Sequence, residues 1–271
     1  MKLDIVRADP AGNITIFVLN RIDDPLLRVR AAKALLAEPS LGAEQVGFVV
    51  PPAGPGALWR LDMMGGEFCG NAARSFGLYA ARELGLKGKL SIPVSVSGTD
   101  RPVTVTADVE AFWAEAEIPL PRGFDTLVHE GRPYPVYFFE GITHVIAQDV
   151  NPGRDLVGNL LELAKKKIPE RGGEHALDAF GVMFYEKRRC FIRPVVYVAA
   201  ADSLVFESSC GSGTAALILA LAGNLNDGEG RWEVSQPGGL IEGRVKKEAG
   251  EIKALSIGGP VALDSRRPVI L

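Results

Sequence analysis

The chain has 271 residues, of which 47% are hydrophobic and 23% charged, and its formal net charge is -3. This length and composition allow a substantial core in one large or two medium domains and exclude a disordered or fibrous chain. The slightly acidic balance leaves no basic footprint for nucleic acid, and no apolar run has membrane-spanning length. The N-terminus lacks the apolar core of a signal peptide. Three cysteines without paired spacing indicate a reducing compartment, so we expect a cytoplasmic protein.

The first part of the chain predicts strands alternating with helices. Residues 2–6 and 13–19 are β-branched and alternating, and the turn Asp9-Pro10-Ala11-Gly12 lies between them. Asp24 and Pro25 predict the start of a helix that runs to about residue 38. Further strands are expected at 45–50, 57–63, 90–96, 102–107 and 111–117, with a helix from Cys69 to Leu84.

The second part of the chain predicts the same order of elements. Asn151 and Pro152 open a helix to about Lys167, as Asp24 and Pro25 do earlier. The stretch Gly211–Leu221 contains almost no charge, so its helix should be buried on nearly all sides. Strands are expected at 132–139, 142–148, 180–185 and 190–198, and a closing antiparallel set within 231–257.

Two cysteines lie in near-copies of one motif. Cys69-Gly70-Asn71-Ala72-Ala73 and Cys210-Gly211-Ser212-Gly213-Thr214 stand 141 positions apart, and each precedes an apolar, helix-like run. Two copies are too few for a solenoid, so we expect two homologous lobes. The predicted fold is α+β, with lobes 1–120 and 121–271 that are pseudo-symmetric and each form a mostly antiparallel, barrel-like sheet around a central helix. The same offset relates Leu78 to Leu219, Ala81 to Ala222, Leu84 to Leu225, Gly98 to Gly239 and Pro119 to Pro260.

The paired motif suggests a specific chemistry. A thiol at the first turn of a helix lies beside unpaired N–H groups and the positive end of the helix dipole, which favour the thiolate. Two such helix ends facing each other would attract the carboxylate of an amino acid. One sulfur would then remove the α-proton as thiolate while the other returns a proton as thiol. We therefore predict that Cys69 and Cys210 catalyse racemisation or epimerisation in a cleft between the lobes. No cofactor is expected, and no metal, because His129 and His175 have no partner at metal-ligand spacing.

These motifs resemble the two catalytic motifs of the cofactor-independent diaminopimelate epimerase and proline racemase superfamily. The resemblance covers Glu67-Phe68-Cys69-Gly70-Asn71-Ala72 and Glu207-Ser208-Ser209-Cys210-Gly211-Ser212-Gly213-Thr214 and extends over nearly the whole chain. Pro10-Ala11-Gly12-Asn13 resembles the motif of a substrate-binding asparagine. His144, in Gly141-Ile142-Thr143-His144, falls where the epimerases carry an active-site histidine.

A closer resemblance is to the histidine racemases that supply D-histidine for opine-type metallophores. Glu44-Gln45-Val46-Gly47-Phe48 and Ser235-Gln236-Pro237-Gly238-Gly239 carry it, together with the first cysteine motif. Glu207 lies only three positions before Cys210, whereas diaminopimelate epimerases have a longer segment there with an arginine and a second glutamate. The resemblance implies catalytic roles for Glu44, Glu207 and His144, and homodimerisation. It also implies an amino-acid substrate bound by Asn13, Gln45, Gly70, Asn71, Gly211 and Ser212.

Alternatives stay open at this level. The chain could be a diaminopimelate epimerase or another amino-acid epimerase. It could also be an isomerase of a non-amino-acid substrate, like phenazine-pathway relatives, or a ligand-binding or redox-sensing protein whose thiols form a disulfide. His144 also fits a hydrogen-bonded core histidine and Asn13 a turn residue, while Glu44 and Glu207 fit surface or capping carboxylates. Cys190 has no comparable context and is interpreted as structural.

Overall fold

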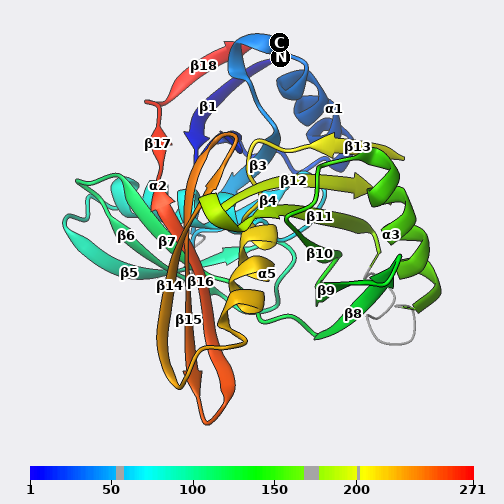
Figure 1. The fold of residues 1–271 in the computed structure, drawn as a ribbon. Coiled ribbons are helices and arrows are strands. Elements are labelled where there is room, and N and C mark those ends of the chain that lie inside the picture. The colour runs from blue at the N-terminus through cyan, green and yellow to red at the C-terminus, as the bar shows by residue number, and fades with distance from the viewer. Residues whose placement is uncertain (53–57, 168–176, 200–201) are drawn as a thin grey trace. The chain divides into compact units, whose positions relative to one another are not determined.

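The computed structural model describes residues 1–52, 58–167, 177–199 and 202–271 (Figure 1). His175 and the first residue of the strand expected at 57–63 lie outside these ranges. The fold is mixed α+β, as predicted. The helices in the described residues are α1 (Pro25–Leu36), α2 (Gly70–Glu83), α3 (Arg154–Lys167) and α5 (Gly211–Ala222), with short 3₁₀ helices at Pro39–Leu41 and Lys187–Arg189.

The chain divides into two compact units. Unit 1 comprises Met1–Glu117 and Gly258–Leu271, and unit 2 comprises Ile118–Ile257. Strand β16 (Glu251–Pro260) carries the chain from unit 2 back into unit 1. The strands of unit 1 are β1 (Lys2–Asp9), β2 (Thr15–Val18), β3 (Gln45–Val50), β4 (Arg60–Met63), β5 (Lys89–Val96), β6 (Val103–Asp108), β7 (Trp113–Glu117), β17 (Ala262–Leu263) and β18 (Arg267–Ile270). Those of unit 2 are β8 (Gly123–His129), β9 (Arg132–Phe139), β10 (Ile142–Gln148), β11 (Ala179–Glu186), β12 (Phe191–Val198), β13 (Ser203–Phe206), β14 (Gly228–Gln236) and β15 (Gly239–Glu248).

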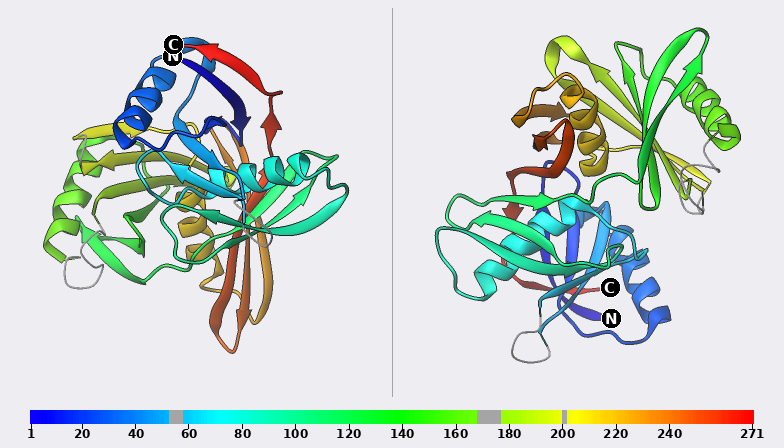
Figure 2. Two further views of the ribbon diagram at one scale, coloured as in Figure 1. Left: turned by 180° about the vertical axis from the view of Figure 1, so that it is seen from behind. Right: turned by 90° about the horizontal axis from the view of Figure 1, so that it is seen from below.

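The C-terminal segment belongs to the first unit, whereas the sequence placed it in a lobe of residues 121–271. Strand β18 pairs antiparallel with β1, and Ala262 and Leu263 of β17 pair with the last residues of the same strand. Both chain ends therefore lie together (Figure 2), and the Leu271 N–H donates to the Met1 carbonyl over 2.8 Å. The hydrogen bonds of β1 fix this return, and neither β17 nor β18 shows a periodic pattern long enough to predict it.

Strand pairing follows the same pattern in both units. In unit 1, β1–β2 is antiparallel, β2–β3 parallel and β3–β4 antiparallel. In unit 2, β9–β10 is antiparallel, β10–β11 parallel and β11–β12 antiparallel. In each unit a short parallel contact, β4–β5 or β12–β14, then leads into an antiparallel hairpin. Strands β8 and β13 were not predicted. Both carry exposed hydrophobic residues, among them Phe124 and Phe206, so in neither strand do hydrophobic residues mark the buried face and polar residues the exposed one.

Helix α2 packs on β5, β6 and β7 in unit 1, and helix α5 packs on β10, β11 and β15 in unit 2 (Figures 1 and 2). As expected for a helix without charges, α5 is buried along most of its length. In each unit, this helix packs closely on a strand at the position of a glycine. A Cβ on Gly77 of α2 would lie 2.4 Å from Val105 Cγ1 of β6, and a Cβ on Gly243 of β15 would lie 2.3 Å from Ile218 Cγ1 of α5. Residues 77 and 218 are 141 positions apart, so the glycine lies on the helix in one unit and on the strand in the other.

Candidate active site

Cys69 is the N-cap residue of α2. Its backbone is extended, and its sulfur accepts a hydrogen bond from the Ala72 N–H over 3.4 Å. The sulfur thus occupies the place that a serine or aspartate oxygen takes at most helix starts. An N–H donor at this position stabilises negative charge on the sulfur. Local sequence produces this arrangement, because Gly70 follows the cap directly and the helix continues through small residues.

A chain of polar side chains lies beside Cys69 in unit 1. Asn13 Nδ2 donates to Glu44 Oε2 over 2.8 Å, and Asn71 Nδ2 donates to Asn13 Oδ1 over 3.3 Å. Asn13 Oδ1 also lies 3.9 Å from Cys69 Sγ, at hydrogen-bonding distance for sulfur. Asn13 and Asn71 are buried. The structure therefore brings together four residues proposed from the sequence: Asn13, Glu44, Cys69 and Asn71.

Gln45 follows Glu44 but is not part of this chain of hydrogen bonds. Its Oε1 is buried and has no hydrogen-bond partner within the part of the chain that the structure describes. Gln45 begins β3, where its backbone pairs with Thr15. The structure thus shows a strand position for this residue, and its predicted substrate contact stays a prediction.

Arg74 extends this chain of hydrogen bonds, and together with Asn13, Glu44 and Asn71 it forms the unit 1 network. Sequence reasoning missed Arg74. Its side chain has no exposed surface, and its Nε donates to Asn71 Oδ1 over 3.2 Å. One of its terminal nitrogens donates to the carbonyls of Gly259 and Pro260, over 2.9 and 3.2 Å. A lone arginine inside the otherwise uncharged run Ala72-Ala73-Arg74-Ser75-Phe76 was the available signal, because a charge on a buried helix face needs partners.

Cys210 is the corresponding N-cap residue of α5 and is almost fully buried. Its N–H donates to Gln236 Oε1 over 2.8 Å, and Gln236 Nε2 donates to Thr214 Oγ1 over 2.8 Å. The Thr214 hydroxyl donates back to the Cys210 carbonyl over 2.7 Å. This closed ring of hydrogen bonds holds the backbone of Cys210 in place. Gln236 lies in a motif that the sequence singled out, but its role and that of Thr214 were not predicted.

The surroundings of Cys210 favour its protonated form. Burial raises the pKa of the Cys210 thiol well above its ordinary value, and the negative charge of Glu207 raises it further. The Gly213 N–H and the Ser212 hydroxyl act in the opposite direction. Glu207 is thus placed beside the second thiol, as the family resemblance implied. Ser212 Oγ lies 3.7 Å from Cys210 Sγ.

His144 is linked to Cys210 through Ser212. Its Nε2 lies 2.8 Å from Ser212 Oγ, and its ring is fully buried against Phe139. Burial lowers the pKa of His144 to about 3, so the imidazole is neutral at physiological pH. Its Nδ1 has no hydrogen-bond partner among the described residues and packs against Gly181, where a Cβ would lie only 2.3 Å away. A neutral imidazole in this position can orient the serine hydroxyl.

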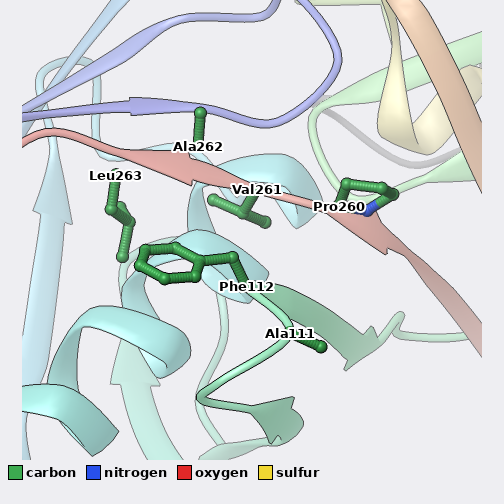
Figure 3. A pocket seen from close by; sticks show the side chains of 6 residues that line it. All are labelled: Ala111, Phe112, Pro260, Val261, Ala262 and Leu263. Atoms are coloured by element: carbon green, nitrogen blue, oxygen red, sulfur yellow. The ribbon is translucent and has the colours of Figure 1, made fainter.

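Other features of the described residues do not form a competing site. They contain no group of three or more His, Cys, Asp or Glu side chains placed to hold a metal ion. None of their helices combines the length and apolar character that a bilayer crossing requires. A shallow hollow of about 400 Å³ in unit 1 contains neither cysteine (Figure 3). Its lining is Ala111, Phe112, Pro260, Val261, Ala262 and Leu263.

Comparison with solved structures defines the class of fold. The chain is similar to a hydroxyproline epimerase from Agrobacterium vitis, with a TM-score of 0.67 and 12% identity, covering 99% of this chain and 92% of that one. It is also similar to a predicted epimerase from Pseudomonas aeruginosa, with a TM-score of 0.66 and 13% identity over the full length of both chains. The fold is therefore that of these epimerase structures.

Sequence comparison then identifies the family. The chain belongs to the family described as the histidine racemase CntK N-terminal domain, whose model matches residues 2–267. A histidine racemase of Fusobacterium nucleatum subsp. nucleatum is 31% identical over 269 residues, which cover 96% of this chain and 94% of the relative. The resemblance to racemases and epimerases drawn from the cysteine motifs is confirmed, and the protein is a member of an isomerase family.

Proposed function

We propose that this protein is a histidine racemase that interconverts L- and D-histidine without a cofactor. The observation that carries the proposal is the pair of cysteines, each the N-cap of the central helix of its own unit. The relatives named histidine racemases support the choice of substrate. A cytoplasmic, reducing setting would keep both thiols available.

The reaction needs one base and one acid on opposite faces of the α-carbon. One cysteine, as thiolate, takes the α-proton and becomes a thiol, and the electron pair moves into an enolate-like carboxylate. The other cysteine, as thiol, gives its proton to the opposite face and becomes a thiolate. The reaction involves no net oxidation or reduction, and at its end the two sulfurs have exchanged protonation states. Backbone N–H groups at the two helix starts would stabilise the charge that develops on the carboxylate.

The two lobes are proposed to be pseudo-symmetric, with one thiol from each acting on the same substrate. The raised pKa of Cys210 supports a thiol there as the proton donor in the first half-reaction. Glu207, Ser212 and His144 would control its protonation, and Glu44 and Asn13 would serve the Cys69 side. Substrate contacts are proposed for Gln45, Gly70, Asn71 and Gly211, and homodimerisation rests on the family resemblance alone.

The test follows the α-hydrogen of L-histidine in D₂O by proton NMR, with optical rotation measured in parallel. The racemisation rate should fall by at least about a thousandfold in C69S and in C210S. A serine hydroxyl stays protonated at its ordinary pKa and is then a far weaker base than a thiolate. C190S is the matched control and should keep the wild-type rate. Racemisation that survives in C69S or C210S would remove the cysteine pair from the mechanism.

The same assay separates the alternative substrates and functions. Each L-amino acid and diaminopimelate is incubated in turn, and histidine should exchange fastest. Preferential turnover of diaminopimelate would replace the substrate assignment while leaving the reaction in place. Ligand binding with no exchange of any α-hydrogen would instead favour a binding or redox-sensing protein.

A further inference from the structure

The residues at the two ends of the unit 1 network can each hydrogen-bond in one direction only. At one end is Arg74, whose guanidinium can only donate. At the other end is Glu44, whose carboxylate can only accept. Between them lie the side-chain amides of Asn71 and Asn13, and every amide has one accepting and one donating face.

These two ends determine which way both amides face. Arg74 Nε requires an acceptor, so Asn71 must turn Oδ1 toward it and Nδ2 toward Asn13. Glu44 Oε2 requires a donor, so Asn13 must turn Nδ2 toward it and Oδ1 toward Asn71. Either end alone would give the same orientation, and together they exclude the reverse one. The carbonyls of Gly259 and Pro260 fix the guanidinium itself, since they accept from its terminal nitrogen.

This polarity decides what faces Cys69. Asn13 presents Oδ1, an acceptor, at 3.9 Å from the sulfur, while Ala72 presents an N–H donor at 3.4 Å. A thiol can donate to Asn13, and a thiolate can accept from Ala72. A residue that acts as a base in one direction and as an acid in the other needs both partners. With the amides reversed, Asn13 would present a donor to Cys69 in place of this acceptor.

We propose that Arg74 is a positioning residue that, together with Glu44, locks the amides of Asn71 and Asn13 so that Cys69 keeps a hydrogen-bond acceptor beside its proton. The functional meaning of this lock rests on the proposed racemase activity, but the lock itself does not. Among the described hydrogen bonds of this network, the charged side chains are those of Glu44 and Arg74.

The experiment is a double-mutant cycle read out by the alkylation of Cys69. Iodoacetamide reacts with the thiolate, and mass spectrometry of the Cys69 peptide gives its rate against pH in a C210S background. The midpoint of the profile reports how well the thiolate is stabilised, and the plateau at high pH reports accessibility. R74M and E44Q each leave one end of the lock in place. In R74M/E44Q both amides are free to turn, so the midpoint should fall by about one pH unit more than the sum of the single shifts.

Three further variants make the result decisive. R74K keeps a donor toward Asn71, so R74K/E44Q should behave like E44Q. N71L cuts the chain while leaving Arg74 in place, so N71L/E44Q should reproduce the coupling even where R74M fails to fold. R82M removes an exposed arginine of the same helix, which stacks on Phe112, and R82M/E44Q should be additive.

Additive midpoints in both R74M/E44Q and N71L/E44Q would overturn the proposal. A change confined to the plateau would also overturn it, because it would mean that loosening rather than polarity altered the reactivity of Cys69. Histidine racemisation, measured separately, tests the proposed function. A cycle that shows coupling in a protein that does not racemise histidine would leave the lock standing and remove the activity.

Discussion

Gly181 connects the packing of unit 2 to its candidate catalytic group, and G181A is the variant that tests this connection. Gly181 lies in β11 directly opposite His144 in the parallel pair β10–β11. A Cβ at this position would lie 2.3 Å from His144 Nδ1 and 2.7 Å from Cε1, closer than carbon and nitrogen atoms approach in folded proteins. The ring must therefore shift by about 1 Å, although it is fully buried.

We expect G181A to destabilise unit 2 by about 1–3 kcal/mol, the usual cost of overpacking a core, or roughly 5- to 150-fold in its opening equilibrium. Moving the ring also disturbs the 2.8 Å contact between His144 Nε2 and Ser212 Oγ, so the racemisation rate should fall by about two- to tenfold. Hydrogen exchange followed by mass spectrometry measures the opening of β10 and β11. The matched control is G158A in α3, where a Cβ meets nothing within 4 Å and alanine should stabilise the helix by about 1 kcal/mol.

Wild-type protection of β10 and β11 in G181A, together with a wild-type rate, would refute the reasoning. It would mean that the strands separate enough to admit a methyl group without moving the imidazole. Loss of protection with an unchanged rate would refute only the link from His144 through Ser212 to Cys210.

Two further predictions concern titration in unit 2. Burial depresses the pKa of His144 to about 3, against an ordinary value near 6.5. Between these pH values the unfolded chain binds more protons than the folded one. The free energy of unfolding should therefore rise with pH over this range, by at most about 1.4 kcal/mol per pH unit. This contribution is complete above pH 6.5 and is lost on acidification; urea midpoints at pH 4, 5 and 7 should show it, and H144Q should have a flatter profile. E207Q removes a charge that raises the pKa of Cys210, so alkylation of Cys210 at pH 7.5 should become faster than in the wild type. The control is E186Q, which changes an exposed carboxylate paired with Arg189 and should leave the alkylation rate unchanged. An E207Q rate equal to that of the wild type would mean that the charge of Glu207 does not control the Cys210 thiol.

Local sequence determines the start of each helix that begins at a motif cysteine. A cysteine in extended conformation followed by glycine and small residues defines the N-caps of α2 and α5, and cap geometry depends on only a few consecutive residues. The 141-residue repeat likewise reflects the amino-acid order alone. The mixed α+β fold, the burial of α5 and the family were therefore predictable before any coordinates were known.

Tertiary structure decided how distant segments meet. Asn13, Glu44 and Asn71 come from three separate parts of unit 1, and only the pairing of β2 with β3 and the packing of α2 bring their amides and carboxylate into one chain. Arg74 appears in the sequence as one charge among apolar neighbours. Its partners, the carbonyls of Gly259 and Pro260, lie at the far end of the chain and become neighbours when the C-terminal strands return to β1. Hydrogen-bond partners of a buried charge depend on where the backbone ends up in space, and a local pattern carries no information about a contact 185 residues away.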